Sequence, residues 1–367
     1  MATIADIIRF LEAFAPPDLA ADWDNVGLLL GERSSAVRRV LTCLTVTPES
    51  AAEAIDAGAQ LIVSHHPIFF KAIRRLTDST AEGRMLLALA RAGVAVYSPH
   101  TAFDNCANGI NALIASRLSL TEVAPLKPGS TAAECKVVVF VPEQDLQRLL
   151  SSLFEAGAGH IGQYRECSFR TGGFGTFFGT ESTNPAVGQK GRREDVAEFR
   201  LEVVCRESAV SSVLAAARRS HSYEEPAIDV YPLRSRPTAV GEGRIGVLAK
   251  EASLAEFATG VRAALASGPV QVVGEPTRTV RRVAIVCGAG GSFLGDAVRA
   301  GVDVLLTGEA RFHDYLEARA AGLALVLPGH YATERPGAEA LASRLADEFP
   351  ELDVAASRHE TDPVGWV

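Results

Sequence analysis

The apolar positions of this chain alternate between helical stripes and short continuous runs. Apolar side chains at positions 4, 7, 8 and 11 predict a first amphipathic helix, which Pro16 and Pro17 end. Further along, alanine-rich helical stretches end in glycine, and a β-prone apolar run follows each of them. Continuous apolar runs are typical of strands that are covered on both faces. The pattern therefore predicts an α/β fold with a mostly parallel sheet.

Four of these apolar runs lead into a histidine or a glutamate. The runs cover 61–63, 94–97, 304–306 and 325–327, and the residues that follow them include His65, His66, His100, Glu309 and His330. In an open parallel sheet, ligands bind beyond the carboxyl ends of the strands. We therefore expect these four segments, which are far apart in sequence, to meet at one crevice.

The middle of the chain does not show this alternation of helical stretches and apolar runs. Its pattern over 131–235 predicts the order βαββαβ, which is the ferredoxin-like arrangement. Segments rich in Pro, Gly and Ser at 125–131 and 234–243 are suitable junctions. The sequence thus predicts an inserted domain between a first lobe, 1–128, and a second lobe, 240–367.

Composition narrows the class of protein. A chain of 367 residues suggests about two to three domains. The net charge of −8 repels phosphate backbones, so nucleic acid is an unlikely partner. The N-terminus lacks the pattern of an export signal and no apolar run is long enough to span a membrane, so we expect a cytoplasmic protein without membrane contact. The six cysteines form no CxxC pair, which favours reduced thiols.

Carboxylates accompany two of the histidines at the same spacing. Asp104 follows His100 by four residues, and Glu334 follows His330 by four. Imidazole and carboxylate together form the ligand set of Zn, Fe, Mn or Ni sites. The alternative for Glu334 is an acidic residue that favours the first turn of a helix capped by Thr333.

The adjacent pair His65 and His66 adds to this set. Consecutive side chains on extended backbone point to opposite faces, so two metal ions are the natural solution if both residues bind metal. The alternative is a strand-end pair in which one histidine is buried and the other is solvated.

Two further features suggest chemistry beside a metal site. Glu309 and His313 are candidate proton-transfer groups, or simply a first-turn acid and an exposed helix histidine. The glycine-rich segment 288–291 follows a predicted strand, and its N–H groups are candidates for holding a phosphate or carboxylate. The alternative is a tight strand-to-helix turn.

Five motifs in this order resemble the Nif-three-like family, often labelled GTP cyclohydrolase I type 2 homologues. They are Trp23-Asp24-Asn25-Val26-Gly27-Leu28, Ser64-His65-His66-Pro67, His100-Thr101 with Asp104, Thr307-Gly308-Glu309 with His313, and Gly329-His330-Tyr331 with Glu334. The resemblance spans about 1–125 and 240–367. The middle segment is similar to the PII/CutA-like domain of longer family members, through the stretches at 157–164 and 221–226.

The resemblance implies two similar αβ lobes with an inserted ferredoxin-like domain, a dinuclear divalent-metal site and a homohexamer. By the same resemblance, the five metal ligands are His65, His66, Asp104, His330 and Glu334. His100, Glu309 and His313 match residues near that site and are the candidate catalytic residues.

Two functions from different classes fit these observations. The first is a metal-dependent hydrolase of a nucleotide-like or phosphorylated small molecule, in which two divalent ions activate water. The second is a non-enzymatic metal chaperone or regulatory protein whose PII-like insert senses a ligand. Turnover of a substrate distinguishes the first from the second.

Overall fold

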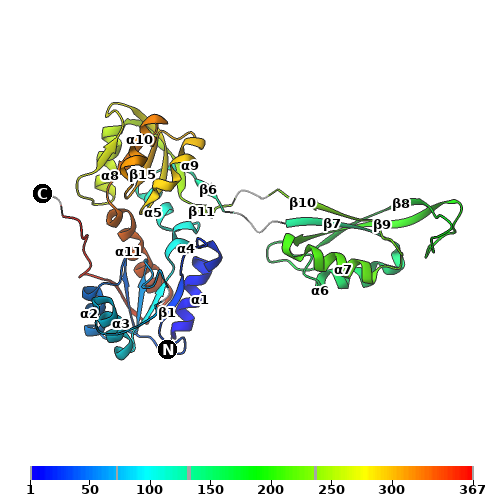
Figure 1. Ribbon diagram of the computed structural model, residues 1–367, viewed down its shortest axis with the longest axis horizontal. Helices are drawn as coiled ribbons and strands as arrows, with labels where there is room; N and C mark the ends of the chain where they lie inside the picture. The colour runs from blue at the N-terminus through cyan, green and yellow to red at the C-terminus, as the bar shows by residue number, and fades with distance from the viewer. Residues whose placement is uncertain (1, 72, 130–133, 235–237, 366–367) are drawn as a thin grey trace. The chain divides into compact units, whose positions relative to one another are not determined.

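The computed structural model describes residues 2–71, 73–129, 134–234 and 238–365. It divides into two compact units, Met1–Gly129 with Thr238–Val367, and Ser130–Pro237. Figure 1 shows both, and each unit is described by itself.

The first unit contains a five-stranded sheet in the order β1-β4-β3-β2-β17. Its strands are β1 (Gly27–Leu30), β2 (Arg39–Cys43), β3 (Leu61–Ser64), β4 (Ala95–Ser98) and β17 (Asp353–Ala356). The pairs β17–β2, β2–β3 and β3–β4 are parallel, and β1 is antiparallel to β4. Every residue of β3 and β4 is buried, which agrees with the continuous apolar runs in the sequence.

A six-stranded sheet of the same unit has the order β13-β16-β15-β14-β12-β5. Its strands are β5 (Thr121–Ala124), β12 (Arg244–Ser253), β13 (Gln271–Val273), β14 (Thr279–Val286), β15 (Val304–Thr307) and β16 (Ala324–Leu327). The neighbours β14, β15 and β16 are parallel, and the other pairs are antiparallel. A short ladder joins β6 (Lys127–Pro128) to β11 (Gly241–Glu242).

The two sheets exchange strands between the predicted lobes. β5 comes from the N-terminal segment but pairs with β12, and β17 comes from the C-terminal segment but pairs with β2. Each sheet therefore combines strands from both sequence segments, because strand pairing joins residues that the order along the chain separates.

Helices flank these sheets in chain order. They are α1 (Ile4–Phe14), α2 (Pro48–Asp56), α3 (Ala81–Ala92), α4 (His100–Asn105), α5 (Ile110–Arg117), α8 (Leu254–Ala264), α9 (Leu294–Arg299), α10 (Phe312–Ala320) and α11 (His330–Glu348). Short 3₁₀ turns are η1 (Pro17–Leu19) and η4 (Gly290–Phe293). The first helix has the predicted stripe buried, and α3 ends at Gly93 in the left-handed conformation expected of a terminating glycine.

One hydrophobic core connects both sheets of the first unit. It contains Val40 and Leu61 from one sheet, Val283 and Val304 from the other, Ile110 of α5 and Leu341 of α11. Figure 1 shows α11 between the two sheets. The strand ends of both sheets are thereby held at fixed positions, which is what a shared site needs.

The start of α11 differs from the sequence prediction. The helix begins at His330 rather than after Thr333, so Pro336 lies inside it instead of in its first turn. The hydroxyl of Thr333 donates to the carbonyl of His330 and accepts from the N–H of Gly288, so it does not cap the helix. Tertiary contacts across to 288 outweighed the local capping preference.

The second unit has the element order β-α-β-β-α-β. Its elements are β7 (Glu134–Val141), η2 (Glu143–Asp145), α6 (Leu146–Glu155), β8 (Ser168–Phe178), β9 (Arg193–Arg206), η3 (Glu207–Ala209), α7 (Val210–Ser220) and β10 (Ile228–Pro232). The sheet order is β10-β7-β9-β8, with every neighbouring pair antiparallel. Leucines of α6 and valines of β7 share one separate hydrophobic core.

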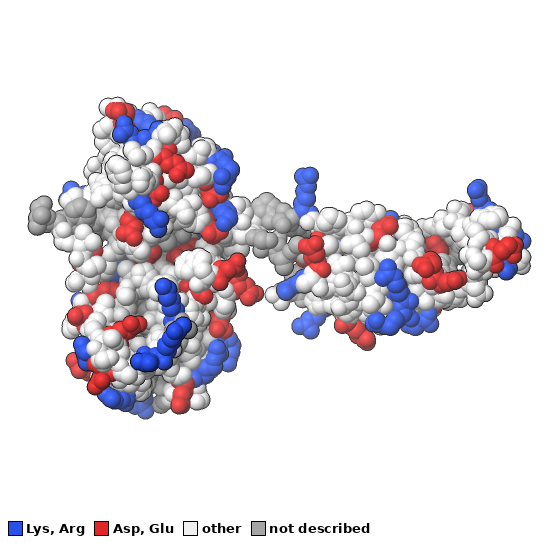
Figure 2. Space-filling view, in the orientation of Figure 1, with Lys and Arg blue, Asp and Glu red and all other residues white. Residues whose placement is uncertain are grey.

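No helix among the described residues is long and apolar enough to cross a membrane. Figure 2 shows acidic and basic side chains intermingled on the visible face of each unit.

Candidate metal centre

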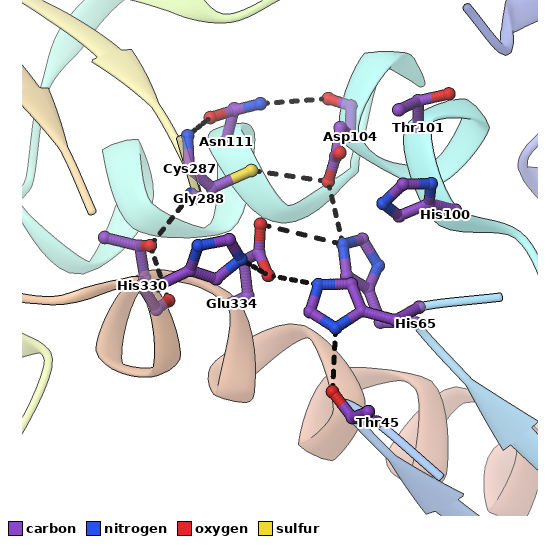
Figure 3. Close-up of polar contacts among 12 residues, drawn as sticks. Thr45, His65, His100, Thr101, Asp104, Asn111, Cys287, Gly288, His330 and Glu334 are labelled. Carbon is purple, nitrogen blue, oxygen red and sulfur yellow. Dashed lines mark hydrogen bonds and ion pairs between the residues drawn. The ribbon is translucent and has the colours of Figure 1, made fainter. Parts of the chain in front are cut away.

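The candidate site lies where parallel strands of both sheets end. Its residues follow β3 (His65, His66), β4 (His100, Asp104), β14 (Cys287, Gly288), β15 (Glu309) and β16 (His330, Glu334). The structure therefore brings together the four strand-end segments that the sequence predicted to converge. Figure 3 shows His65, His100, Asp104, His330 and Glu334 facing a common centre.

His65 is the most informative residue of the cluster. Its side chain is 0% exposed, yet neither ring nitrogen has a hydrogen-bond partner among the described residues. Burial holds its pKa well below the usual range, so the imidazole is neutral. Its Nε2 lies 3.6 Å from Asp104 Oδ1 and 3.9 Å from Glu334 Oε1. A buried, neutral imidazole with an unused nitrogen is suited to a metal ion.

The neighbouring His66 reaches the same centre, because the chain turns directly after β3. The two rings lie 5.2 Å apart between centroids. Nδ1 of His66 is 2.7 Å from the Thr45 hydroxyl, and Nε2 is 2.9 Å from Glu334 Oε2. Thr45 thus orients the ring and leaves Nε2 directed at the cluster.

Glu334 lies between two imidazoles. Its Oε2 is 2.9 Å from His66 Nε2 and 2.9 Å from His330 Nε2, although the second contact lacks hydrogen-bond geometry. Burial raises the pKa of Glu334, but His330 and His66 lower it more, so the carboxylate is ionised. The carboxylate of Glu334 raises the pKa of His330 to about 9. Glu309, whose Oε1 lies 3.1 Å from His330 Nδ1, makes a smaller contribution in the same direction.

Asp104 is the second carboxylate of the cluster, and 16% of its side chain is exposed. Burial, followed by the negative charge of Glu334, raises the pKa of Asp104 to about 7. The thiol of Cys287 donates to its Oδ1 at 3.3 Å. The side-chain amide of Asn111 joins the backbones of these two residues, because it donates to the carbonyl of Asp104 and accepts from the N–H of Cys287. Two carboxylates this close favour a bound cation, which would neutralise their charge.

His100 is held by a buried aspartate. Its Nδ1 is 2.7 Å from Asp24 Oδ1, and Thr101 donates to Asp24 through both its N–H and its hydroxyl. The φ angle of His100 is +26°, which is rare for a residue with a side chain. Such strain is characteristic of functional sites.

Two groups in the cluster have donors close enough to hold an ion. In the set His65, His66 and His100, and in the set His66, His330 and Glu334, the ligand atoms lie within 4.8 Å of one another. The chemistry of these donors, imidazole nitrogen with carboxylate oxygen, fits a divalent transition metal.

The candidate catalytic residues Glu309 and His313 lie at different distances from the cluster. Glu309 contacts His330, as described above. His313 is exposed near the start of α10, where its ring packs on Phe312, and it does not line the cavities beside the cluster. The structure thus brings His100 and Glu309 to the centre but shows no contact between His313 and it.

Two of the predicted phosphate-binding amides of 288–291 already donate to hydroxyls of the protein. The N–H of Gly288 donates to the Thr333 hydroxyl at 3.0 Å, and the N–H of Gly290 donates to the Thr307 hydroxyl at 2.8 Å. For these two amides the phosphate prediction is wrong, and the alternative of a tight turn is confirmed.

Two cavities border the cluster and share His66 and His330. One of about 560 Å³ also reaches Asp104, Glu334 and the aromatic residues Trp23 and Phe70. The other, of about 470 Å³, extends toward Glu309 and the C-terminal segment 360–364.

The aromatic residues at the larger cavity were not expected there. Trp23 is 67% exposed and Phe70 is 55% exposed. Both rings meet His100 edge-on, at centroid distances of 5.9 and 5.6 Å. The amide of Asn25 joins the two loops by donating to the carbonyl of Phe69 at 2.7 Å.

Sequence reasoning missed the residues that orient the ligands. Asp24, Thr45, Asn111 and Cys287 each bind a histidine or carboxylate of the cluster, or its backbone. The only signal for one of them was the motif Trp23-Asp24-Asn25; single polar residues such as Thr45 and Asn111 have no distinguishing pattern.

Known proteins are similar to this chain over almost its whole length. The family model of Duf34/NIF3 (NGG1p interacting factor 3) matches residues 2–363. A Halalkalibacterium halodurans protein named GTP cyclohydrolase 1 type 2 homolog is 38% identical over 98% of this chain and 98% of its own length. A Bacillus subtilis protein of the same name is 35% identical over 97% and 96%.

Solved structures are also similar. A Staphylococcus aureus protein has a TM-score of 0.82 at 27% identity, covering 100% of this chain and 99% of that one. A Bacillus cereus protein described as related to NIF3 has a TM-score of 0.72 at 34% identity, with the same coverage. On the match along the whole sequence, this chain belongs to the Duf34/NIF3 family.

Proposed function

We propose that the protein is a hydrolase that uses two divalent metal ions to act on a nucleotide-like or phosphorylated small molecule. The observation that carries the proposal is His65, which is fully buried and whose ring nitrogens have no hydrogen-bond partner in the described part of the chain. Three further imidazoles and two carboxylates surround it. A buried imidazole without partners costs folding free energy, and a bound metal ion would remove this cost by coordinating its nitrogen.

The donor arrangement supports two ions rather than one. Two groups of close donor atoms share His66, one with His65 and His100 and the other with His330 and Glu334. In the proposed ligand set Asp104, whose Oδ1 lies 3.6 Å from His65 Nε2, takes the place of His100. His65, His66, Asp104, His330 and Glu334 would hold Zn, Fe, Mn or Ni. Such ions supply Lewis-acid activation of water and of a substrate oxygen.

The residues around these ligands have separate roles in the proposal. Asp24 fixes the ring of His100 through Nδ1, so its Nε2 is the atom that would exchange a proton with substrate. Glu309 is 60% exposed and binds Nδ1 of His330, so it orients this ligand and is placed to accept a proton from solvent.

The substrate class is supported by the walls of the larger cavity. Trp23 and Phe70 are exposed aromatic rings beside His100, and such rings suit stacking on a planar base. Relatives carry the name GTP cyclohydrolase 1 type 2 homolog, which is consistent with a purine nucleotide.

Turnover by the metal-loaded protein tests the proposal. Zn, Fe, Mn and Ni forms are assayed against GTP, other nucleotides and phosphoesters, with release of formate or phosphate as the measure. Hydrolysis is expected in at least one combination, and His66→Ala should abolish it by removing a ligand of both groups. His313→Ala is the matched histidine control, and an equal loss there would show that the cluster alone does not account for activity.

A metal chaperone is the second candidate, favoured by the partial exposure of two ligands. The side chains of His66 and His330 are 18% and 34% exposed, so an ion could leave through either cavity. If no substrate in the panel is hydrolysed while the bound metal passes to an apoprotein acceptor, this candidate replaces the hydrolase.

We also propose the finer architecture that the family resemblance implies. The strand order of the second unit, numbered along that unit, is 4-1-3-2, which supports a ferredoxin-like, PII/CutA-like insert. The parallel cores of the two larger sheets support two related lobes. A homohexamer is the proposed assembly, and light scattering on the eluting protein tests it.

A further inference from the structure

A third cavity lies within the second unit, apart from the residues of the candidate metal centre. It has a volume of about 530 Å³ and is formed by the end of β8, the residues that follow it, and the segment before β10. Phe140, Phe177, Val187 and Tyr223 contribute apolar surface to its walls. Cavities of this size and lining are suited to a small organic molecule.

Three glutamates give this cavity its charge. Glu198, Glu224 and Glu225 line it, whereas no lysine or arginine is among its described lining residues. None of the three glutamates forms an ion pair with a described residue. One of them, Glu224, accepts a hydrogen bond from the N–H of Asn184 at 3.0 Å.

The hydroxyl of Tyr223 adds a polar group beside the cavity. Its oxygen is buried and has no hydrogen-bond partner within the described part of the chain. Burial and the nearby Glu198 raise the pKa of Tyr223, so the hydroxyl is protonated and able to donate or accept. Buried hydroxyls in native proteins are normally satisfied by protein, water or ligand.

From these observations we propose that this cavity binds an organic cation with a flat apolar body, such as an arylalkyl ammonium. The aromatic rings would contact the body of the ligand and attract its charge through their faces. The glutamates would pair with the ammonium, and the Tyr223 hydroxyl would accept one of its N–H groups. This binding activity is independent of hydrolysis at the metal centre.

Gly175 allows the position of one carboxylate to be tested without changing charge. A Cβ at this residue would lie 2.3 Å from Glu198 Oε2, so Gly175→Ala displaces that flexible side chain. The φ angle of Gly175 is outside the left-handed region, so alanine fits the backbone. Glu198→Gln removes the charge itself, and Glu155→Gln is the control at an exposed glutamate of α6 that does not line the cavity.

The experiment titrates the full chain with benzylamine, benzyl alcohol and benzoate at neutral pH, followed by calorimetry and ligand-observed NMR. We expect benzylamine to bind, and the neutral and anionic analogues to bind at least about tenfold more weakly. Glu198→Gln and Gly175→Ala should each weaken benzylamine about tenfold, and Glu155→Gln should leave it unchanged.

Several results would overturn the proposal. They are equal affinity for benzylamine and benzyl alcohol, no benzylamine binding, or binding that neither Gly175→Ala nor Glu198→Gln changes. Displacement of benzylamine by an equal concentration of Mg²⁺ would assign the cavity to metal ions instead. Circular dichroism of each variant separates lost binding from lost folding, and Gly175→Ala retains every charged group if Glu198→Gln does not fold.

Discussion

Gly288 shows how a single residue shapes the metal centre. Its φ angle is +64°, and a Cβ there would lie 2.1 Å from Glu334 Oε1 and 3.3 Å from His330 Nε2. The backbone thus approaches two proposed ligands more closely than any side chain permits. The glycine-rich turn, predicted from sequence as an anion site, instead provides space for the Glu334 carboxylate.

We expect Gly288→Ala to reduce bound metal, because the new methyl group displaces Glu334. A displaced ligand should weaken metal affinity about 10-fold to 100-fold. Gly301→Ala is the matched control, since its φ angle is +63° and nothing lies within 4 Å of the added Cβ. Both variants should lose about 1 kcal/mol of stability from the left-handed backbone. Elemental analysis and urea unfolding measure the two effects, and equal metal loss in both variants would contradict the assignment.

Asp24 predicts a pH dependence of folding in the metal-free protein. Burial raises its pKa, but hydrogen bonds from His100 and Thr101 lower it more, to about 2 from 3.8. Because the pKa is lower in the folded state, the stabilisation is present above about pH 4 and is lost as the pH falls toward 2. Between pH 6 and pH 3 this loss is about 1 kcal/mol.

Urea unfolding at pH 6 and pH 3 measures this contribution. Asp24→Asn should reduce the difference between the two pH values by about 1 kcal/mol. The control is Asp22→Asn, which changes a nearby exposed residue and should leave the difference as in the wild type. An identical pH dependence in wild type and Asp24→Asn would show that the hydrogen bonds do not depress this pKa.

Among the elements, α11 connects the metal centre to the C-terminal segment. Its start carries His330 and Glu334 on one face, four residues apart, and Arg335 of the same turn points to the other side. Arg335 pairs with Glu360 at 2.8 Å, and Glu360 also accepts the N–H groups of Leu44 and Thr45 beyond β2. The helix is thereby attached to the loop that orients His66.

Glu360→Gln should destabilise the protein through this contact. Its side chain is 3% exposed, and loss of its charge leaves the guanidinium of Arg335 without its buried partner. The expected cost is about 3 kcal/mol in the free energy of unfolding. Glu339→Gln tests the exposed partner of the same arginine, at 3.8 Å and 53% exposure, and should cost less than about 0.5 kcal/mol. Similar losses in the two variants would mean that burial does not strengthen the Glu360 contact.

The molecule as a whole has separate hydrophobic cores in its two units. The largest cluster of the first unit contains residues from both sheets, while the cluster of the second unit lies within 137–228. We therefore expect each unit to unfold cooperatively and independently of the other. The residues of the candidate metal centre all belong to the first unit.

Scanning calorimetry should show two transitions, of which only one responds to metal. A metal present at a thousandfold its dissociation constant stabilises its site by about 4 kcal/mol, equivalent to about 10 °C in a unit of this size. Chelation should lower one transition by that amount and leave the other in place. A single transition, or equal shifts of both, would contradict independent folding of the units.

Local sequence patterns determined those helices and strands that depend on apolar periodicity and backbone preference. The apolar stripe of α1, the buried runs β3, β4, β15 and β16, and the glycine that ends α3 follow from periodicity and backbone preference. Because ligands of such sheets collect at strand ends, the convergence of His65, His66 and the segments near 100, 309 and 330 was also predictable.

Only the tertiary structure decided the properties that depend on contacts between distant segments. The exchange of β5 and β17 between sheets, the early start of α11 and the exposure of His313 arise from pairing and packing that have no local signature. The same holds for Asp24 behind His100 and Thr45 behind His66, since a single hydrogen-bonding side chain acquires its role from the partner that folding places beside it. Short-range propensities therefore predicted the strand ends at which the proposed ligands lie, and long-range packing selected the residues that orient them.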